Sequence, residues 1–148
     1  MAVFKFFAAA GLASTLSLIG PGAWAQTNSA YRSADAVAGK SQRLGVYGNV
    51  TKECTPGPLP EIRMVIPPKH GELAVRNGTL KVGRITRCPN LAPKAQGVFY
   101  RANPNYTGPD EVGYEVRSSS GKVEAHTVKI TVKDKPPGGT RSIDDADL

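Results

Sequence analysis

The sequence contains few of the side chains that catalyse reactions or bind metals, with only two cysteines and two histidines among 148 residues. The histidines, His70 and His126, are far apart, and neither has the i, i+4 spacing or neighbouring Cys/Asp cluster of a metal site. No G-x-S-x-G elbow, phosphate-binding loop or G-x-G-x-x-G fingerprint occurs. These absences favour a non-enzymatic role with no metal and no cofactor; a hydrolase is the least favoured alternative.

Long apolar runs are also scarce, and the longest one lies at residues 6–19. Lys5 precedes this run, Gly20-Pro21-Gly22 interrupts it, and Ala23-Trp24-Ala25 supplies an A-x-A site. This order is typical of a cleaved secretory signal peptide, and the run is short for a membrane span. We therefore expect cleavage after Ala25 and a periplasmic or secreted protein that is not transmembrane. An uncleaved N-terminal anchor is the alternative.

The two cysteines, Cys54 and Cys88, are expected to form one disulfide, which is the simplest outcome for a pair in an exported chain. Neither lies in a C-x-x-C motif or beside a histidine. A structural bond is therefore favoured over a reactive or metal-binding pair.

Charge is unevenly distributed, with 19 Lys and Arg against 12 Asp and Glu in the whole chain. The basic residues are concentrated in residues 39–133, whereas residues 134–148 are acidic. A basic body can attract lipopolysaccharide, anionic lipid or nucleic acid, although a solvated surface that aids solubility is the simpler interpretation. The residues that could form a polyanion-binding face are Lys81, Arg84, Arg87, Lys94 and Arg101.

Period-two alternation of apolar residues predicts strands throughout the body of the chain. The clearest runs are residues 61–66, 112–116 and 123–133, and Asn77-Gly78 predicts a type I′ hairpin between residues 72–76 and 79–82. No stretch has a convincing helical pattern. Seven or eight short strands, with turn signals spaced about 8 to 12 residues apart, indicate an all-β chain that forms an antiparallel sandwich or barrel.

The predicted domain organisation follows from composition. Residues 26–38 are small and polar and are expected to be a flexible leader, and residues 39–133 are expected to form the sandwich. Residues 134–148 contain Pro-Pro-Gly-Gly and then few apolar residues, so a disordered acidic tail is expected.

The central stretch carries a family resemblance. Asn103-Pro104-Asn105-Tyr106-Thr107-Gly108, followed by Asp110 and the alternating Val112, Tyr114 and Val116, resembles the bacterial immunoglobulin-like and cadherin-like repeats of surface and periplasmic proteins. The similarity covers about residues 67–132 and includes P-x-H-G-x-L at residues 68–73 and T-V-x-I-T-V at residues 127–132. The resemblance implies an antiparallel immunoglobulin-like β-sandwich of about seven strands, used for adhesion or scaffolding.

Some positions depart from that family pattern: Val98 replaces an aromatic residue, Ala102 replaces a proline, and Arg117 replaces an acidic residue. Asp110 with Glu111 supplies too few oxygen ligands for calcium. Tyr106 is expected to cap the core and use its hydroxyl on the backbone, and Tyr114 is expected to be buried.

Together these observations predict an exported binding or scaffolding module of the cell envelope. Its expected partner is an envelope protein that the sequence does not identify. Polyanion binding through the basic face is the alternative.

Overall fold

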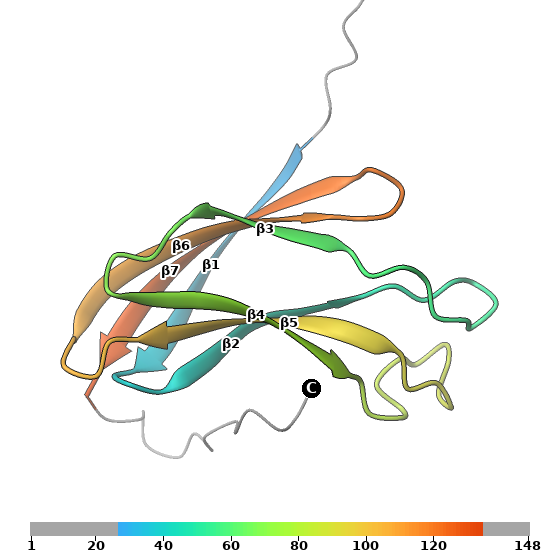
Figure 1. Ribbon diagram of the computed structural model, residues 1–148, viewed down its shortest axis with the longest axis horizontal. Coiled ribbons are helices and arrows are strands. Elements are labelled where there is room, and N and C mark those ends of the chain that lie inside the picture. Colours follow the sequence, from blue (N-terminus) through green and yellow to red (C-terminus); the bar gives the residue numbers. More distant parts are fainter. Residues whose placement is uncertain (1–26, 135–148) are drawn as a thin grey trace, which may run out of the picture.

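The computed structural model describes residues 27–134, which form two sheets packed face to face (Figure 1). Within this range every regular element is a strand. The strands are β1 (Thr27–Val37), β2 (Ser41–Gly48), β3 (Glu61–Ile66), β4 (Gly71–Thr79), β5 (Lys94–Ala102), β6 (Gly108–Arg117) and β7 (Val123–Lys133). The predicted signal peptide, and the predicted tail beyond Asp134, lie outside the described residues.

The first four strands alternate between the two sheets, whereas β4 and β5, and then β6 and β7, are consecutive strands paired within one sheet. One sheet has the order β1-β7-β6-β3 and the other has the order β2-β5-β4. All neighbouring strands are antiparallel except β1 and β7, which are parallel. The predicted immunoglobulin-like sandwich of seven strands is therefore confirmed as a fold class.

The core forms from the inward-facing side chains of the alternating strands. In β6, Val112, Tyr114 and Val116 are at most 7% exposed, while the residues between them face outward. Each fully buried side chain of this size contributes roughly 1.5–3 kcal/mol. The core cluster comprises Ala36, Leu44, Val98, Tyr100, Ala102, Val112, Tyr114, Val116, Val128, Ile130 and Val132.

The segment expected to be a flexible leader, residues 26–38, is instead mostly strand β1. Its eleven residues pair in register with β7, from Thr27 opposite Val123 to Val37 opposite Lys133. The composition of β1 is poor in β-branched and aromatic residues, so propensity gave no strand signal. The pairing with the strongly patterned β7 decides the conformation.

The predicted Asn77-Gly78 hairpin is wrong. Both residues continue β4, where Asn77 pairs with Gln96 and Gly78 pairs with Ala95 of β5. The Asn77 side-chain oxygen also accepts a hydrogen bond from Gln96 Nε2 at 3.1 Å. The chain turns later, where Gly83 has a φ of +85°, and residues 80–93 form a long loop. Cross-strand pairing overrides the local turn preference.

Candidate binding surfaces

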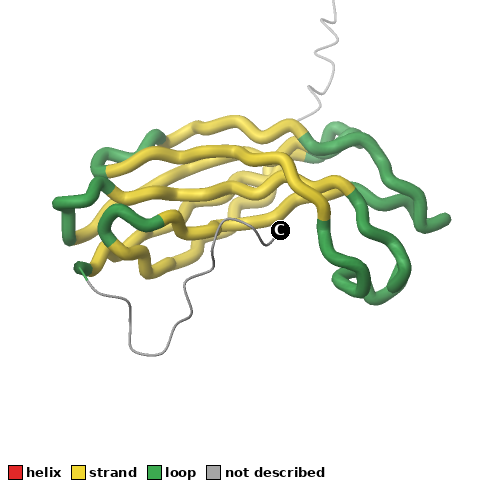
Figure 2. The backbone as a smooth tube through the Cα atoms, turned by 60° about the horizontal axis from the view of Figure 1, so that its bottom comes forward, coloured by secondary structure: helices red, strands yellow, loops and turns green. Residues whose placement is uncertain are grey.

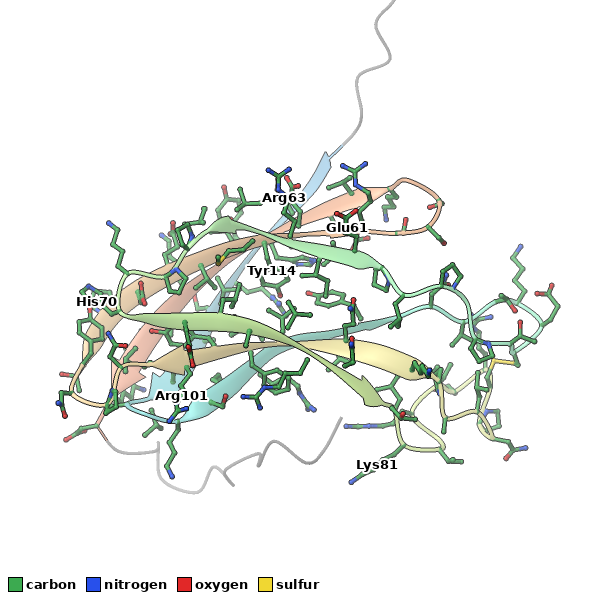
Figure 3. The ribbon with its side chains drawn as sticks, in the orientation of Figure 1. Glu61, Arg63, His70, Lys81, Arg101 and Tyr114 are labelled. Carbon is green, nitrogen blue, oxygen red and sulfur yellow. A yellow bond between two sulfur atoms is a disulfide. The ribbon has the colours of Figure 1, made fainter. Side chains whose placement is uncertain are left out.

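One end of the sandwich is organised by an aromatic corner. The rings of His70 and Tyr106 stack with their centroids 3.9 Å apart, and the Tyr106 hydroxyl donates to the Pro109 carbonyl oxygen at 2.6 Å. The predicted backbone hydrogen bond of Tyr106 is therefore confirmed. The stack joins the turn between β3 and β4 to the turn that precedes β6, and His70 lies at this end in Figure 3.

Asp110 anchors the same corner from inside and is only 8% exposed. Its carboxylate accepts hydrogen bonds from the backbone N–H groups of Lys69, His70 and Glu111 at 2.9–3.0 Å. It also accepts one from the Tyr100 hydroxyl at 2.8 Å. Burial alone would raise the pKa of Asp110, but these hydrogen bonds lower it below its ordinary value. The carboxylate is therefore a structural acceptor, a role that sequence reasoning missed.

A second polar cluster lies between the sheets around Tyr114, which is 1% exposed as predicted. The Tyr47 and Tyr114 hydroxyl oxygens are 2.8 Å apart, and Arg32 donates to the Tyr114 hydroxyl at 2.9 Å. The same Arg32 nitrogen donates to the Leu44 carbonyl oxygen at 2.8 Å. Arg32 thus ties β1 to both sheets, and burial raises the pKa of the Tyr47 hydroxyl.

His126 completes this cluster. Its ring stacks on Tyr114 with centroids 5.0 Å apart and lies 5.5 Å from the ring of Tyr47. Both ring nitrogens are buried and have no hydrogen-bond partner among the described residues. Burial, and then the positive charge of Arg32, lower the pKa of His126, while Glu124 opposes this shift. The arrangement favours a neutral imidazole packed as an aromatic ring.

We expect the free energy of unfolding to decrease as the pH falls from 7 to 5. An unfolded histidine has a pKa of about 6.5, so the unfolded chain takes up the proton before folded His126 does. The stability that neutral His126 contributes is fully present above the unfolded pKa and is lost as the pH falls through the pKa of folded His126. Urea titrations of His126→Phe, which keeps an aromatic ring, should show a smaller change in the free energy of unfolding between pH 7 and pH 5. The same change in the variant as in the wild type would show that His126 does not cause this pH dependence.

β3 forms a free edge of the four-stranded sheet and exposes a cluster of apolar side chains. Met64, Val65 and Ile66 are 51%, 53% and 37% exposed. A bulge at Val65 shifts the register, so that Met64 pairs with Tyr114 and Ile66 pairs with Gly113. The period-two alternation of residues 61–66 predicts that Ile66 shares one face with Ile62 and Met64. That prediction is wrong, because the bulge turns Ile66 onto the outer face above Gly113.

The outer face beside this edge carries balanced charge. Glu61 pairs with Arg117, and Arg63 pairs with Glu115 across β3 and β6, and these four residues line one shallow hollow. Figure 3 shows Glu61 and Arg63 along the β3 ribbon. The β3 edge, defined here as Glu61–Ile66, therefore combines apolar side chains with alternating charges.

The structure does not bring the five predicted polyanion-binding residues together. Lys81, Arg84, Arg87 and Lys94 lie in or beside the loop of residues 80–93, whereas Arg101 lies near the other end of β5. Lys94 and Arg101 are seven positions apart along β5, which corresponds to about 23 Å. Figure 3 shows Arg101 toward the side of the molecule where His70 lies and Lys81 nearer the side of the projecting loops.

Arg87 is engaged within the protein. Its guanidinium donates to the carbonyl oxygens of Thr51 and Val50 at 2.8 and 2.5 Å. The predicted disulfide between Cys54 and Cys88 is present, with Cα atoms 5.5 Å apart. The disulfide and Arg87 together hold the loop after β2 against the loop before β5. Figure 2 shows these loops, in green, projecting at one end.

A cleft of about 350 Å³ lies beneath these tied loops. Its apolar lining includes Val50, Leu80, Ile85 and Pro93, and Asn49 and Arg87 supply polar groups. Since Arg87 already binds backbone carbonyls, the cleft offers few converging polar groups for a small ligand.

Among residues 27–134, no group of three or more His, Cys, Asp or Glu side chains could hold a metal ion. The same part of the chain contains no apolar helix of membrane-spanning length.

Comparison with known proteins does not assign the chain to a family. No protein-family model matches the chain, and no curated protein matches it significantly.

Proposed function

We propose that the mature chain is an exported, non-enzymatic binding module of the cell envelope, and that a protein partner adds a strand to the β3 edge. The observation that carries this proposal is the exposure of three adjacent large apolar residues, Met64, Val65 and Ile66, on an unpaired edge. An edge strand presents unpaired backbone N–H and C=O groups, which an extended segment can satisfy.

The side chains of β3 define the chemistry of the partner segment. Ile62 and Met64 point to the core side of the strand, and Glu61 and Arg63 point outward. A strand added here would place apolar side chains beside Ile62 and Met64. Its alternate positions would carry a basic group near Glu61 and an acidic group near Arg63, since opposite charges across neighbouring strands are stabilising.

The envelope location rests on separate observations. The first 25 residues have the order of a signal peptide, and the Cys54–Cys88 bond is compatible with an oxidising compartment. The resemblance of the Asn103–Gly108 corner to bacterial immunoglobulin-like and cadherin-like repeats supports a scaffolding or adhesion role. The wide separation of Arg101 from Lys81 and the internal bonds of Arg87 disfavour the alternative polyanion face.

The proposal can be tested by site-specific photocrosslinking of the mature protein in native envelope extract. A crosslinker at Met64 should capture one protein in about 0.5 M salt, whereas one at Lys129, on the outer face of β7, should not. The purified partner should then slow hydrogen exchange of the β3 amides. Equal capture from both positions, or unchanged exchange in β3, would contradict strand addition.

Arg63→Glu should weaken partner binding about 5-fold, because it replaces an attractive cross-strand pair by a repulsive one worth roughly 1 kcal/mol in total. Lys129→Glu makes the same change of charge on β7 and should leave the affinity unchanged. Titration of the captured partner against both variants measures the difference. Equal losses would mean that net charge alone governs binding.

A further inference from the structure

The outer face of the three-stranded sheet has a buried aromatic residue at its centre. Phe99 lies on β5 between the core residues Val98 and Tyr100, so its side chain points away from the core. It is nevertheless only 5% exposed. The Arg76 guanidinium carbon lies 5.1 Å from the Phe99 ring centroid, in cation–π geometry.

The residues around Phe99 combine apolar and cationic character. Register places Arg43 of β2 and Ala74 of β4 on either side of Phe99. On one side of this row Val46 and Arg76 flank Gly97, and on the other side Ser41 and Glu72 flank Arg101. The sheet-B face, as we call it, consists of Arg43, Val46, Glu72, Ala74, Arg76, Phe99 and Arg101. Three arginines and one glutamate surround a small apolar floor.

The chain itself contains a segment of complementary composition. Residues 143–148 read Ile-Asp-Asp-Ala-Asp-Leu, with three carboxylates, two large apolar residues and no basic residue. This segment lies outside the described residues. Its acidic groups suit the three arginines, and its Ile143 and Leu148 suit the apolar floor.

The point where β7 ends allows this segment to reach the face. Ala38 N–H donates to the Lys133 carbonyl oxygen at 2.9 Å, and Gly39 N–H donates to the Ala102 carbonyl oxygen at 3.1 Å. The chain therefore leaves β7 beside the end of β5, close to Arg101. Residues 135–148 can span up to about 46 Å when extended, whereas β5 is about 30 Å long.

We propose that residues 143–148 dock on the sheet-B face of the same molecule, with their carboxylates beside Arg43, Arg76 and Arg101 and an apolar side chain over Phe99. The segment would then be an intramolecular ligand that covers part of the basic body. This inference concerns the opposite sheet from the β3 edge and does not depend on the proposed function.

The test uses NMR relaxation of the full mature chain at low salt. We expect backbone order parameters near 0.8 for residues 143–148, with contacts between an Ile143 or Leu148 methyl and the Phe99 ring. In the triple variant Asp144→Asn, Asp145→Asn, Asp147→Asn, the order parameters of residues 143–148 should fall below about 0.6, the flexible range. This variant changes no residue of the sandwich, so loss of folding does not confuse the result.

A variant of the face provides the reciprocal test. Arg43→Gln with Arg101→Gln should release the segment, whereas Arg117→Gln with Lys129→Gln, an equal loss of charge on the other sheet, should not. Order parameters below 0.6 in the wild type, or order that persists in the triple Asn variant, would overturn the proposal. Order that rises with protein concentration would also overturn it, because the occupied face would then belong to a second copy.

Discussion

Asp110→Ala should lower the free energy of unfolding by about 3–5 kcal/mol at pH 7, the largest loss expected for any single substitution discussed for this chain. The substitution removes the acceptor of four hydrogen bonds, including that of the Tyr100 hydroxyl. Tyr100 is fully buried, so its hydroxyl is left without a partner in an apolar environment. Urea denaturation with the disulfide intact measures the loss.

The neighbouring Glu111→Ala is the matched control, since its side chain is exposed and its effect should stay within about 0.5 kcal/mol. The two variants should also differ in acid. The lowered pKa of Asp110 means that its stabilisation is fully present above about pH 4 and is lost as the pH falls through the folded pKa. Asp110→Ala should lack this acid-dependent loss. Equal stability of the two variants would refute the anchoring role.

Removal of the Cys54–Cys88 bond by paired serine substitutions should cost about 4 kcal/mol, the chain-entropy value for the loop that it closes. The two cysteines are 34 residues apart in sequence, so their bond restricts a large part of the unfolded chain. Because Arg87 still binds the Thr51 carbonyl, the two loops should keep some contact. Thermal and urea denaturation of the double variant measure the change.

Hydrogen exchange locates the same effect within the structure. Exchange should accelerate most in residues 49–60 and 80–93, which the bond joins, and least in β6 and β7. Arg87→Gln in the oxidised protein is the companion variant, because it removes the hydrogen bonds and keeps the disulfide. A loss below 1 kcal/mol for the serine pair would show that the hydrogen bonds, rather than the bond between sulfurs, hold the two loops.

The parts of the fold that could be predicted are those where local pattern and tertiary pairing agree. Residues 61–66 and 123–133 are strands with the predicted bounds, and Val112 and Val116 of β6, like Val128 and Val132 of β7, face the core as their alternation indicates. The disulfide was predictable because two cysteines in a chain with a predicted signal peptide have one simple outcome. In these places composition and three-dimensional environment impose the same conformation.

The errors arose where a distant strand decides the conformation. β1 has a polar, alanine-rich sequence, and its pairing with β7 cannot be read from its own residues. Asn77-Gly78 has the composition of a tight turn, yet β5 holds both residues extended. Likewise, the alternation of β3 suggested a buried face, but its position at a sheet edge leaves Met64 half exposed.

The candidate sites were harder to predict than the fold. The basic residues are close in sequence around a hairpin that does not form, so the structure separates Arg101 from the rest. The role of Asp110 depends on backbone N–H groups some 40 residues earlier. The position of an acidic residue directly after the Gly108-Pro109 corner is the one local signal that could have indicated it.

The parallel pairing of β1 with β7 has a mechanical consequence. β1 begins at the end of the sandwich where β7 begins, and β7 ends where β1 ends. A force applied between the start of β1 and the end of β7 would therefore slide the two strands along each other in opposite directions. All rungs of this eleven-residue ladder would bear the load together, rather than opening one after another from one end. The geometry is that of a domain that resists stretching along its long axis.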